Sequence, residues 1–329
     1  MNTDHAPSAA GPGERAAVLC GIGAALPQTV VSNADLTVRL DTTDEWIRTR
    51  TGIAQRRVAD SDLTTADLAV QAAAEALARP SSVPIQALVL ATTTPDRCCP
   101  ATAPAVAARL GLTGIPAFDL AAGCTGFLYA LAAAAGLIAA GTADAVLVIG
   151  ADRLASLPDP DDRTTVPLFG DGAGAAVLRR GTATESGALG QVLLGSDGTH
   201  ADLIRAQHPG ALRMEGAEVF RHAVDRMSTA SCQAAVAAGW AVTDVDRLVP
   251  HQANARITGF TARKLGIPDD RQLHNVEHVG NTGAASIPLL LAQAAADGRV
   301  KPGHRLLLTA FGAGLTWGAT TLTWPDLNP

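Results

Sequence analysis

The chain has 329 residues, of which 47% are hydrophobic and 17% are charged, and its formal net charge at pH 7 is −6. This composition excludes a largely disordered chain and favours one large core or two fused domains of ordinary size. The acidic balance, without a dense block of Lys or Arg, argues against nucleic acid or an anionic membrane as the main partner, although local basic residues can still bind a small anion.

The N-terminus and the cysteines both bear on where the protein works. Residues 1–15 (MNTDHAPSAAGPGER) are polar and rich in Pro, Gly and Ala, so we expect a disordered tail and no secretory signal. No apolar stretch reaches the roughly 20 residues that a membrane-spanning helix needs. An odd number of cysteines without CxxC spacing favours a reduced, cytoplasmic protein.

Runs rich in Val, Leu and Ile alternate with Ala-rich stretches along the rest of the chain. Residues 87–93, 144–152, 246–251 and 304–312 are typical of buried strands, whereas residues 129–140 (YALAAAAGLIAA) are typical of a buried helix. This alternation predicts an α/β protein whose sheets are largely buried.

The chain also contains an internal repeat. Cys124 and Asn281 are each followed, 17 residues later, by a glycine and then by a strand-like run, and the two residues are 157 positions apart. Upstream, AARLGL at 107–112 resembles ARKLGI at 262–267, at an offset of 155. A duplicated α/β unit explains both offsets.

The repeat predicts two halves, residues 16–185 and 186–329, joined in the turn-rich segment 178–191. If the halves pack about a pseudo-twofold axis, the two matching helix starts approach each other. The strand that ends at His251 then reaches the same place, so polar residues far apart in sequence would share one pocket.

Cys124 lies where a strand-like run meets the long apolar helix, in AFDLAAGCTGF. A thiol attacks as its thiolate, and its pKa falls at a helix N-terminus or beside a histidine. Gly123 and Gly126 would allow a ligand to approach the backbone closely. The alternative is a small core residue, because free cysteine is among the most buried residue types.

His251 and Asn281 are ambiguous when each is considered alone. His251 directly follows a strand in LVPHQANARI, where α/β folds bind ligands, yet a single histidine is more often structural. Asn281 precedes a helix in HVGNTGAASIPLLL, and its plain interpretation is an N-cap. Their matching positions in the repeat favour a shared site with Cys124.

Six segments resemble the signature segments of the β-ketoacyl-acyl-carrier-protein synthase III family, which are condensing enzymes of the thiolase fold. In chain order they are TTDEWIRTRTGI, AAGCTGF, FGDGAGAAVL, VPHQANARI, GNTGAASIP and AFGAGLTWG. They cover nearly the whole chain. The resemblance implies a thiolase-like fold, with two pseudo-twofold-related α/β halves in a five-layered α-β-α-β-α arrangement.

The resemblance also implies the catalytic groups. Cys124, His251 and Asn281 would form the Cys-His-Asn triad of the family, and the backbone N–H groups of Cys124 and Ala313 would hold the oxyanion. Related thiolases use a second catalytic cysteine, and elongating ketosynthases use a second histidine where Asn281 stands. Because asparagine cannot titrate, it suits a decarboxylation, which generates its own carbanion.

The implied reaction is a decarboxylative Claisen condensation. An acyl group moves from acyl-CoA to the cysteine and is then attacked by malonyl-acyl carrier protein, in a cytoplasmic homodimer without a permanently bound cofactor or metal. The alternative is a relative that moves the acyl group from coenzyme A or carrier protein to an alcohol or amine without condensation. A non-catalytic partner of this fold would usually have lost the nucleophile.

Two further sets of residues match family positions. Those expected at the nucleotide end of coenzyme A are Trp46, Arg50 and Arg163, since Trp stacks on a base and Arg stacks or pairs with phosphate. Those expected to dock an acidic carrier protein are Arg256, Arg263 and Lys264. Composition alone would favour ordinary surface side chains in both sets.

Three departures from the family pattern favour a specialised starter enzyme, for example one that primes a polyketide. Cys99 lies near a position where many members have a bulky aromatic residue that closes the acyl pocket. The stretch between residues 195 and 220 looks shorter than in typical relatives, and Thr125 follows the nucleophile where alanine is usual.

Overall fold

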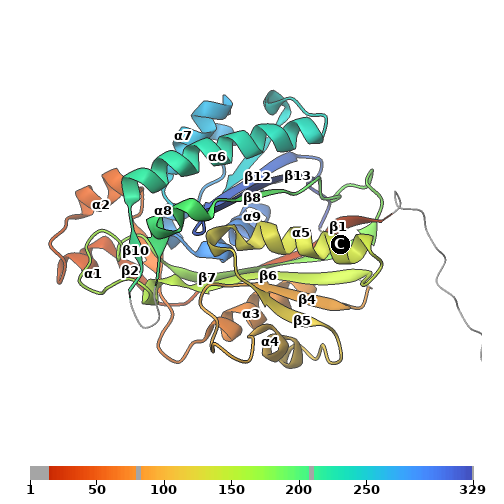
Figure 1. Cartoon of the computed structure of the whole chain (residues 1–329), viewed down its shortest axis with the longest axis horizontal. Coiled ribbons are helices and arrows are strands. Elements are labelled where there is room, and N and C mark those ends of the chain that lie inside the picture. Colours follow the sequence, from red (N-terminus) through yellow and green to blue (C-terminus); the bar gives the residue numbers. More distant parts are fainter. Residues whose placement is uncertain (1–14, 79–82, 207–210, 328–329) are drawn as a thin grey trace, which may run out of the picture.

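Two β-sheets separate three layers of helices in the computed structural model of the chain, which describes residues 15–78, 83–206 and 211–327. Apart from Arg15, the expected tail lies outside the described residues. From top to bottom of Figure 1 the layers are α6 (Gly216–Ala237) and α7 (Ala255–Leu265), the second sheet, α5 (Gly126–Ala139) and α9 (Ser286–Ala296), the first sheet, and α3 (Thr65–Leu77) and α4 (Ala103–Arg109). The predicted α-β-α-β-α arrangement is confirmed.

The first sheet has five strands in the order β1-β7-β6-β4-β5. These strands are β1 (Ala16–Ala25), β7 (Asp171–Gly181), β6 (Ala145–Arg153), β4 (Ala87–Ala91) and β5 (Ala117–Leu120). The strand β4 runs parallel to both β5 and β6, and β7 runs antiparallel to β6 and β1. Because helices cover both faces, β4 and most of β6 are buried runs of Ala, Val, Leu and Ile.

The second sheet repeats this topology with four strands. They are β11 (Arg247–Pro250), β12 (Arg305–Gly312), β13 (Thr316–Thr323) and β8 (Leu193–Ser196), in that order. The pair β11 and β12 is parallel, and β13 is antiparallel to β12 and β8. A single parallel bridge from Leu248 to Gln272 stands where the first sheet has β5. The boundary at residue 185 remains a prediction, since the connecting segment bonds to both sheets.

The structure corrects the register of the predicted repeat. The strands β4 and β11, like β6 and β12, begin 160 residues apart, whereas the helices α5 and α9 end 157 residues apart. The helix α9 is three residues shorter at its start, and the loop after it is correspondingly longer. Cys124 therefore corresponds to Ala284 in the second half, and Asn281 lies three residues before that position.

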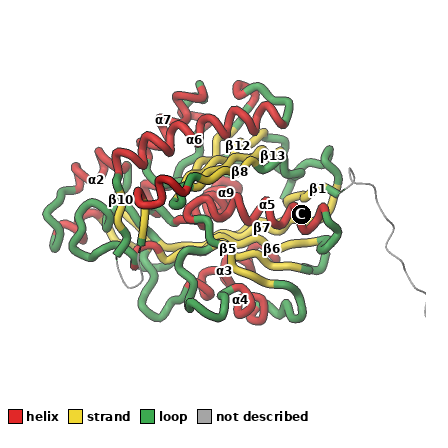
Figure 2. The backbone as a smooth tube through the Cα atoms, in the orientation of Figure 1, coloured by secondary structure: helices red, strands yellow, loops and turns green. Residues whose placement is uncertain are grey.

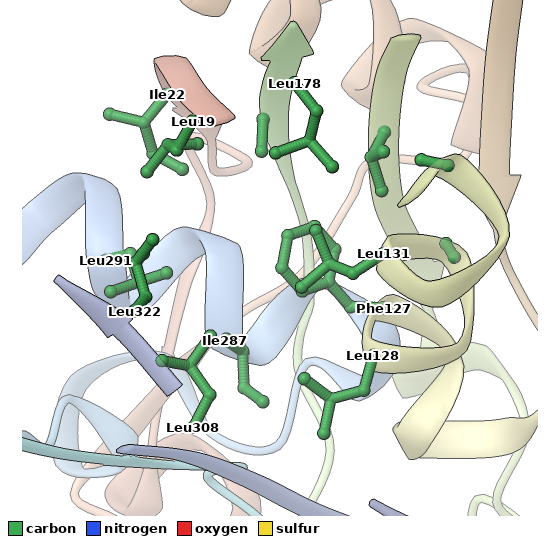
Figure 3. Packing of buried hydrophobic residues seen from close by; sticks show 14 of the residues in the cluster. Leu19, Ile22, Phe127, Leu128, Leu131, Leu178, Ile287, Leu291, Leu308 and Leu322 are labelled. Atoms are coloured by element: carbon green, nitrogen blue, oxygen red, sulfur yellow. The ribbon is translucent and has the colours of Figure 1, made fainter. Parts of the chain in front are cut away.

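The central helices pack between the two sheets. Figure 3 shows Phe127, Leu128 and Leu131 of α5 beside Ile287 and Leu291 of α9. Sheet residues close the same cluster from both sides, namely Leu19, Ile22, Leu178, Leu308 and Leu322. This packing fixes the N-terminal ends of α5 and α9, where the expected site residues lie.

Short elements and loops gather at one end of the molecule (Figure 2). They are β2 (Val30–Ser32), α1 (Asn33–Thr37), α2 (Asp44–Thr51), β3 (Gln55–Arg57), β9 (Ile204–Arg205), β10 (Arg213–Met214) and α8 (Val276–Val279). None of the helices in the described ranges is long and apolar enough to cross a membrane.

Arg56 ties this end together from a buried position, with 1% of its surface exposed. Its guanidinium donates to Val31 O (3.0 Å), Asn33 Oδ1 (2.8 Å) and Pro167 O (2.9 Å), and burial lowers its pKa to about 10. The group thus satisfies three acceptors that water does not reach.

Replacing Arg56 with methionine should lower the free energy of unfolding by about 2–4 kcal/mol, because three acceptors lose their donor. Urea denaturation measures the change. Arg57→Met is the matched control, since the Arg57 guanidinium makes only 3.3 Å contacts with Pro27 O and Gln28 O, and it should cost about 1 kcal/mol or less. Equal losses in the two variants would contradict this assignment.

Candidate active site

Cys124 lies in a short 3-10 turn (Gly123–Thr125) that leads into α5. The backbone beside it approaches a second loop closely: a Cβ at Gly123 would lie 2.9 Å from Ala313 N, and a Cβ at Gly312 would lie 2.7 Å from Cys124 N. Gly123 also has φ +54°, which favours glycine. Glycines at both points therefore let the two expected oxyanion donors, the N–H groups of Cys124 and Ala313, belong to adjacent backbone segments.

The Cys124 thiol is more basic than its place at a helix start predicts. Burial raises its pKa to about 12, and the nearby Asp152 carboxylate adds to this rise. A hydrogen bond with the Asn281 side chain acts in the opposite direction but does not offset the other two effects. The expected lowering of the pKa is therefore not found in the empty site, because desolvation of the charged form outweighs the helix terminus.

His251 directly follows β11 and is held by its backbone N–H, which donates to Thr309 O at 2.8 Å. Only 2% of the residue is exposed, and burial lowers the pKa of the imidazole to about 3. Within the described ranges neither ring nitrogen has a hydrogen-bond partner. A neutral ring thus has both nitrogens free for a ligand, one as donor and one as acceptor.

Asn281 lies in the turn between α8 and α9, and its backbone pairs with the segment before β7. Its N–H donates to Leu168 O (2.8 Å), and its carbonyl accepts from Gly170 N (3.0 Å). Its side-chain Oδ1 accepts from Gly283 N at 3.0 Å. Because Oδ1 is occupied, the amide N–H₂ is the part of the side chain that is free to donate to sulfur or to a ligand.

One cavity of about 970 Å³ connects these groups. Cys124, His251, Asn281 and Ala313 all contribute to its wall, and so do Trp46, Arg50 and Arg256 from α2 and α7. Most of the remaining wall is apolar, including Leu154, Phe169, Leu212, Met214, Val219, Ile257 and Phe311. The arrangement suits an apolar acyl chain beside a thiol, with polar contacts at a few points.

The three residues expected to bind the nucleotide lie together. The Cζ atoms of Arg50 and Arg163 are 5.0 Å and 5.2 Å from the centre of the Trp46 ring. Arg163 does not line the cavity, and its guanidinium also pairs with the Asp41 side chain at 3.1 Å. Trp46 and Arg50 therefore border the cavity, with Arg163 beside them.

The three residues expected to dock a carrier protein differ in their surroundings. Arg256 lines the cavity, and its Cζ lies 5.6 Å from the centre of the Phe220 ring. Arg263 lies over Phe260 at 3.9 Å, away from the cavity wall. Lys264 forms an exposed ion pair with Asp225 at 2.8 Å, so only two of the three cations lack an ion-pair partner in the described ranges.

The aromatic residue Phe220 escaped sequence reasoning, because an aromatic residue in an amphipathic helix is normally a core residue. Cys99 was expected near the acyl pocket. It is exposed and does not line the cavity of its own chain. A smaller residue at this position therefore gives no extra room within one chain.

Two family models match the chain. The model "3-Oxoacyl-[acyl-carrier-protein (ACP)] synthase III" matches residues 118–198, and its C-terminal counterpart matches residues 236–324. These ranges contain Cys124, His251 and Asn281.

Relatives match the chain over almost its full length. β-Ketoacyl-[acyl-carrier-protein] synthase III 3 of Streptomyces coelicolor is 54% identical over 96% of this chain and 99% of its own. The crystal structure of 3-oxoacyl-(acyl carrier protein) synthase III from Pseudomonas aeruginosa has a TM-score of 0.93 at 50% identity, over 96% of this chain and 100% of its own.

A third relative comes from specialised metabolism. The structure of the priming β-ketosynthase from the R1128 polyketide biosynthetic pathway has a TM-score of 0.91 at 35% identity, over 98% of this chain and 100% of its own. The thiolase-like fold expected from the sequence is thereby confirmed. The chain belongs to the β-ketoacyl-[acyl-carrier-protein] synthase III family of acyl-transferring enzymes that form a carbon–carbon bond.

Proposed function

We propose that the chain takes an acyl group from acyl-CoA onto Cys124 and condenses it with malonyl-acyl carrier protein, to start a fatty-acid or polyketide chain. The observation that carries the proposal is the pairing of a buried thiol with the Asn281 amide, which cannot titrate, in a cavity shared with a neutral histidine. Such a site can donate hydrogen bonds to an oxyanion but holds no carboxylate or second thiol at its centre.

Acylation in this scheme is a thioester exchange. The Cys124 sulfur attacks the thioester carbonyl, the N–H groups of Cys124 and Ala313 hold the oxyanion, and the thiol proton ends on the departing coenzyme A sulfur. A thiol whose pKa is raised by burial fits this step, since the exchange starts from a thiol and releases a thiol.

Condensation then needs donors and no general base. The His251 ring and the Asn281 amide donate to the thioester oxygen of malonyl-acyl carrier protein, so loss of carbon dioxide leaves an enolate that they stabilise. The enolate carbon attacks the acyl carbonyl, the β-ketoacyl carrier protein forms, and the released Cys124 sulfur takes up a proton.

Coenzyme A acts here as a substrate, bound through Trp46, Arg50 and Arg163. Trp46→Ala should raise the KM for acyl-CoA by about tenfold, because stacking on a base contributes about 1–3 kcal/mol, and should leave kcat nearly unchanged. Steady-state kinetics with acyl-CoA and with the acyl-pantetheine thioester, which lacks the nucleotide, measures this difference.

Trp240→Ala is the matched control for this variant, since Trp240 also lies beneath an arginine, Arg305, at 5.3 Å but outside the cavity. It should leave both KM values unchanged. A tenfold rise for acyl-pantetheine as well as acyl-CoA in Trp46→Ala would contradict the nucleotide role.

The malonyl carrier protein is proposed to dock beside the cavity mouth, on Arg256 with Arg263 and Lys264. The homodimer is proposed to form along β5, which is an edge strand and exposes 38% of Phe118. A cytoplasmic location is proposed because an odd number of cysteines without CxxC spacing suits a reducing compartment.

The primer is proposed to come from specialised metabolism slightly more than from housekeeping fatty-acid synthesis. This preference draws on the sequence departures at Thr125 and in the stretch after residue 195, and on the similarity to a polyketide priming enzyme. The large apolar cavity supports a chain longer than acetyl.

Intact mass spectrometry of the carrier protein tests the proposal. The enzyme is incubated with a panel of linear and branched acyl-CoAs and malonyl-acyl carrier protein, and we expect the carrier to gain a β-ketoacyl mass from particular donors. If Cys124 becomes acylated while malonyl carrier protein stays unchanged, the enzyme moves acyl groups to an alcohol or amine instead, and the condensation proposal is wrong.

A further inference from the structure

Asp152 is a buried acid that the proposed reaction does not use. It lies near the end of β6 with none of its surface exposed. No Arg, Lys or His in the described part of the chain forms an ion pair with it. A buried carboxylate without a cation is costly unless hydrogen bonds satisfy it, so its donors show what it holds in place.

The two carboxylate oxygens bind two different segments. Oδ1 accepts from the loop after β4, through Thr93 N (2.7 Å), Thr93 Oγ1 (2.8 Å), Thr92 Oγ1 (3.2 Å) and Thr94 Oγ1 (3.3 Å). Oδ2 accepts from Ala284 N at 2.8 Å, in the turn before α9. One side chain of the first half thus holds a turn of the second half.

That turn sets the position of Asn281. Gly283 N donates to Asn281 Oδ1 at 3.0 Å, and the next N–H, that of Ala284, donates to Asp152. The turn also packs tightly against the carboxylate, since a Cβ at Gly283 would lie 2.3 Å from Asp152 Oδ2. Moving the carboxylate would therefore move the amide that hydrogen-bonds the Cys124 thiol.

We propose that Asp152 is a positioning residue for the condensing half-reaction: it anchors the turn that aims the Asn281 amide into the cavity. The same carboxylate holds Thr93, which lines the cavity opposite that turn in sequence. The proposal rests on the proposed function, because it assigns Asn281 to condensation rather than to acylation.

Asparagine cannot replace Asp152, although it has the same shape. Both carboxylate oxygens accept a backbone N–H, from Thr93 and from Ala284, and an amide offers an acceptor on one side only. Its NH₂ group would face one of the two N–H groups and displace that segment. Asp152→Asn also removes a negative charge near Cys124, which favours the thiolate.

The test compares the two half-reactions of the full-length Asp152→Asn variant. We expect condensation with malonyl-acyl carrier protein to fall about 10- to 100-fold, because a displacement of about 1 Å in a reacting group has effects of this size. Acylation of Cys124, followed by intact mass, should change by less than about threefold. Alkylation of Cys124 by iodoacetamide should begin at lower pH than in the unmodified enzyme.

Asp171→Asn is the matched control. Asp171 is also buried, with 2% exposed, and its carboxylate accepts from Ala59 N and Ala155 N, both at 2.8 Å, but not from the Asn281 turn. It should destabilise the protein while leaving the ratio of condensation to acylation unchanged. If the Asp152 and Asp171 variants change that ratio equally, or neither changes it, the inference is wrong.

A milder variant keeps the test decisive if Asp152→Asn does not fold. Thr92→Val removes one donor to Oδ1 without changing the shape of the side chain, and it should lower the same ratio by a smaller factor. An unchanged ratio in that variant would overturn the inference. Failure of the unmodified enzyme to form any β-ketoacyl product would instead contradict the proposed function.

Discussion

Replacing Cys124 with alanine is expected to abolish both half-reactions. Without the sulfur no acyl-enzyme can form, and the loss of turnover should be about 10⁴-fold or more, as for other covalent nucleophiles. Intact mass spectrometry after incubation with acyl-CoA should show no added acyl mass, and no β-ketoacyl carrier protein should appear.

Cys232→Ala provides the control, because Cys232 is exposed on α6 and does not line the cavity. This variant should acylate and condense at the rate of the unmodified enzyme. An acyl mass that persists in Cys124→Ala but disappears in Cys232→Ala would place the nucleophile at the wrong cysteine.

The second large effect is expected from His251→Ala and Asn281→Ala, and it should be selective. Each variant removes a donor to the enolate oxygen, and such a donor is commonly worth about 10²- to 10³-fold in rate. Acylation should be affected far less, because its oxyanion is assigned to the backbone N–H groups. Single-turnover measurements of each half-reaction separate the two effects.

Asn275→Ala is the control for the asparagine variant. Asn275 is also buried, with 7% exposed, and its amide donates to Gln293 Oε1 at 2.8 Å outside the cavity. It should leave both half-reactions within a few-fold of normal apart from stability. Equal loss of acylation and condensation in His251→Ala and Asn281→Ala would contradict the division of roles.

Much of the fold was predictable from local patterns. The apolar runs at 87–93, 144–152, 246–251 and 304–312 correspond to β4, β6, β11 and β12, because strands buried on both faces show continuous apolar sequence. The repeat predicted the shared topology of the two sheets. It missed the three-residue shift at the start of α9, which a glycine after each helix cannot reveal.

The position of the expected triad residues was also predictable, but their electrostatics were not. A helix start predicts a lowered thiol pKa for Cys124, whereas the structure buries the thiol beside Asp152 and raises the pKa. The acid at the end of a buried strand-like run was visible in the sequence. Its partners, the Thr93 and Ala284 N–H groups, come from segments about 60 and 130 residues away, so only the packed structure joins them.

Charge pairing on the surface was likewise outside the reach of sequence. Lys264 was grouped with Arg256 and Arg263 as a free cation, yet it pairs with Asp225 from the neighbouring helix. Arg163 similarly pairs with Asp41. Such pairs depend on which helix faces pack together, and the helical period of one segment does not contain that information.

The most direct test of the central claim is a single turnover of isolated acyl-enzyme. Enzyme acylated at Cys124 is freed of acyl-CoA and mixed with malonyl-acyl carrier protein, and carbon dioxide, β-ketoacyl carrier protein and remaining acyl-enzyme are quantified together. The account predicts one carbon dioxide and one β-ketoacyl carrier protein for each acyl group lost from Cys124. Loss of the acyl group without carbon dioxide, or carbon dioxide without β-ketoacyl product, would contradict it.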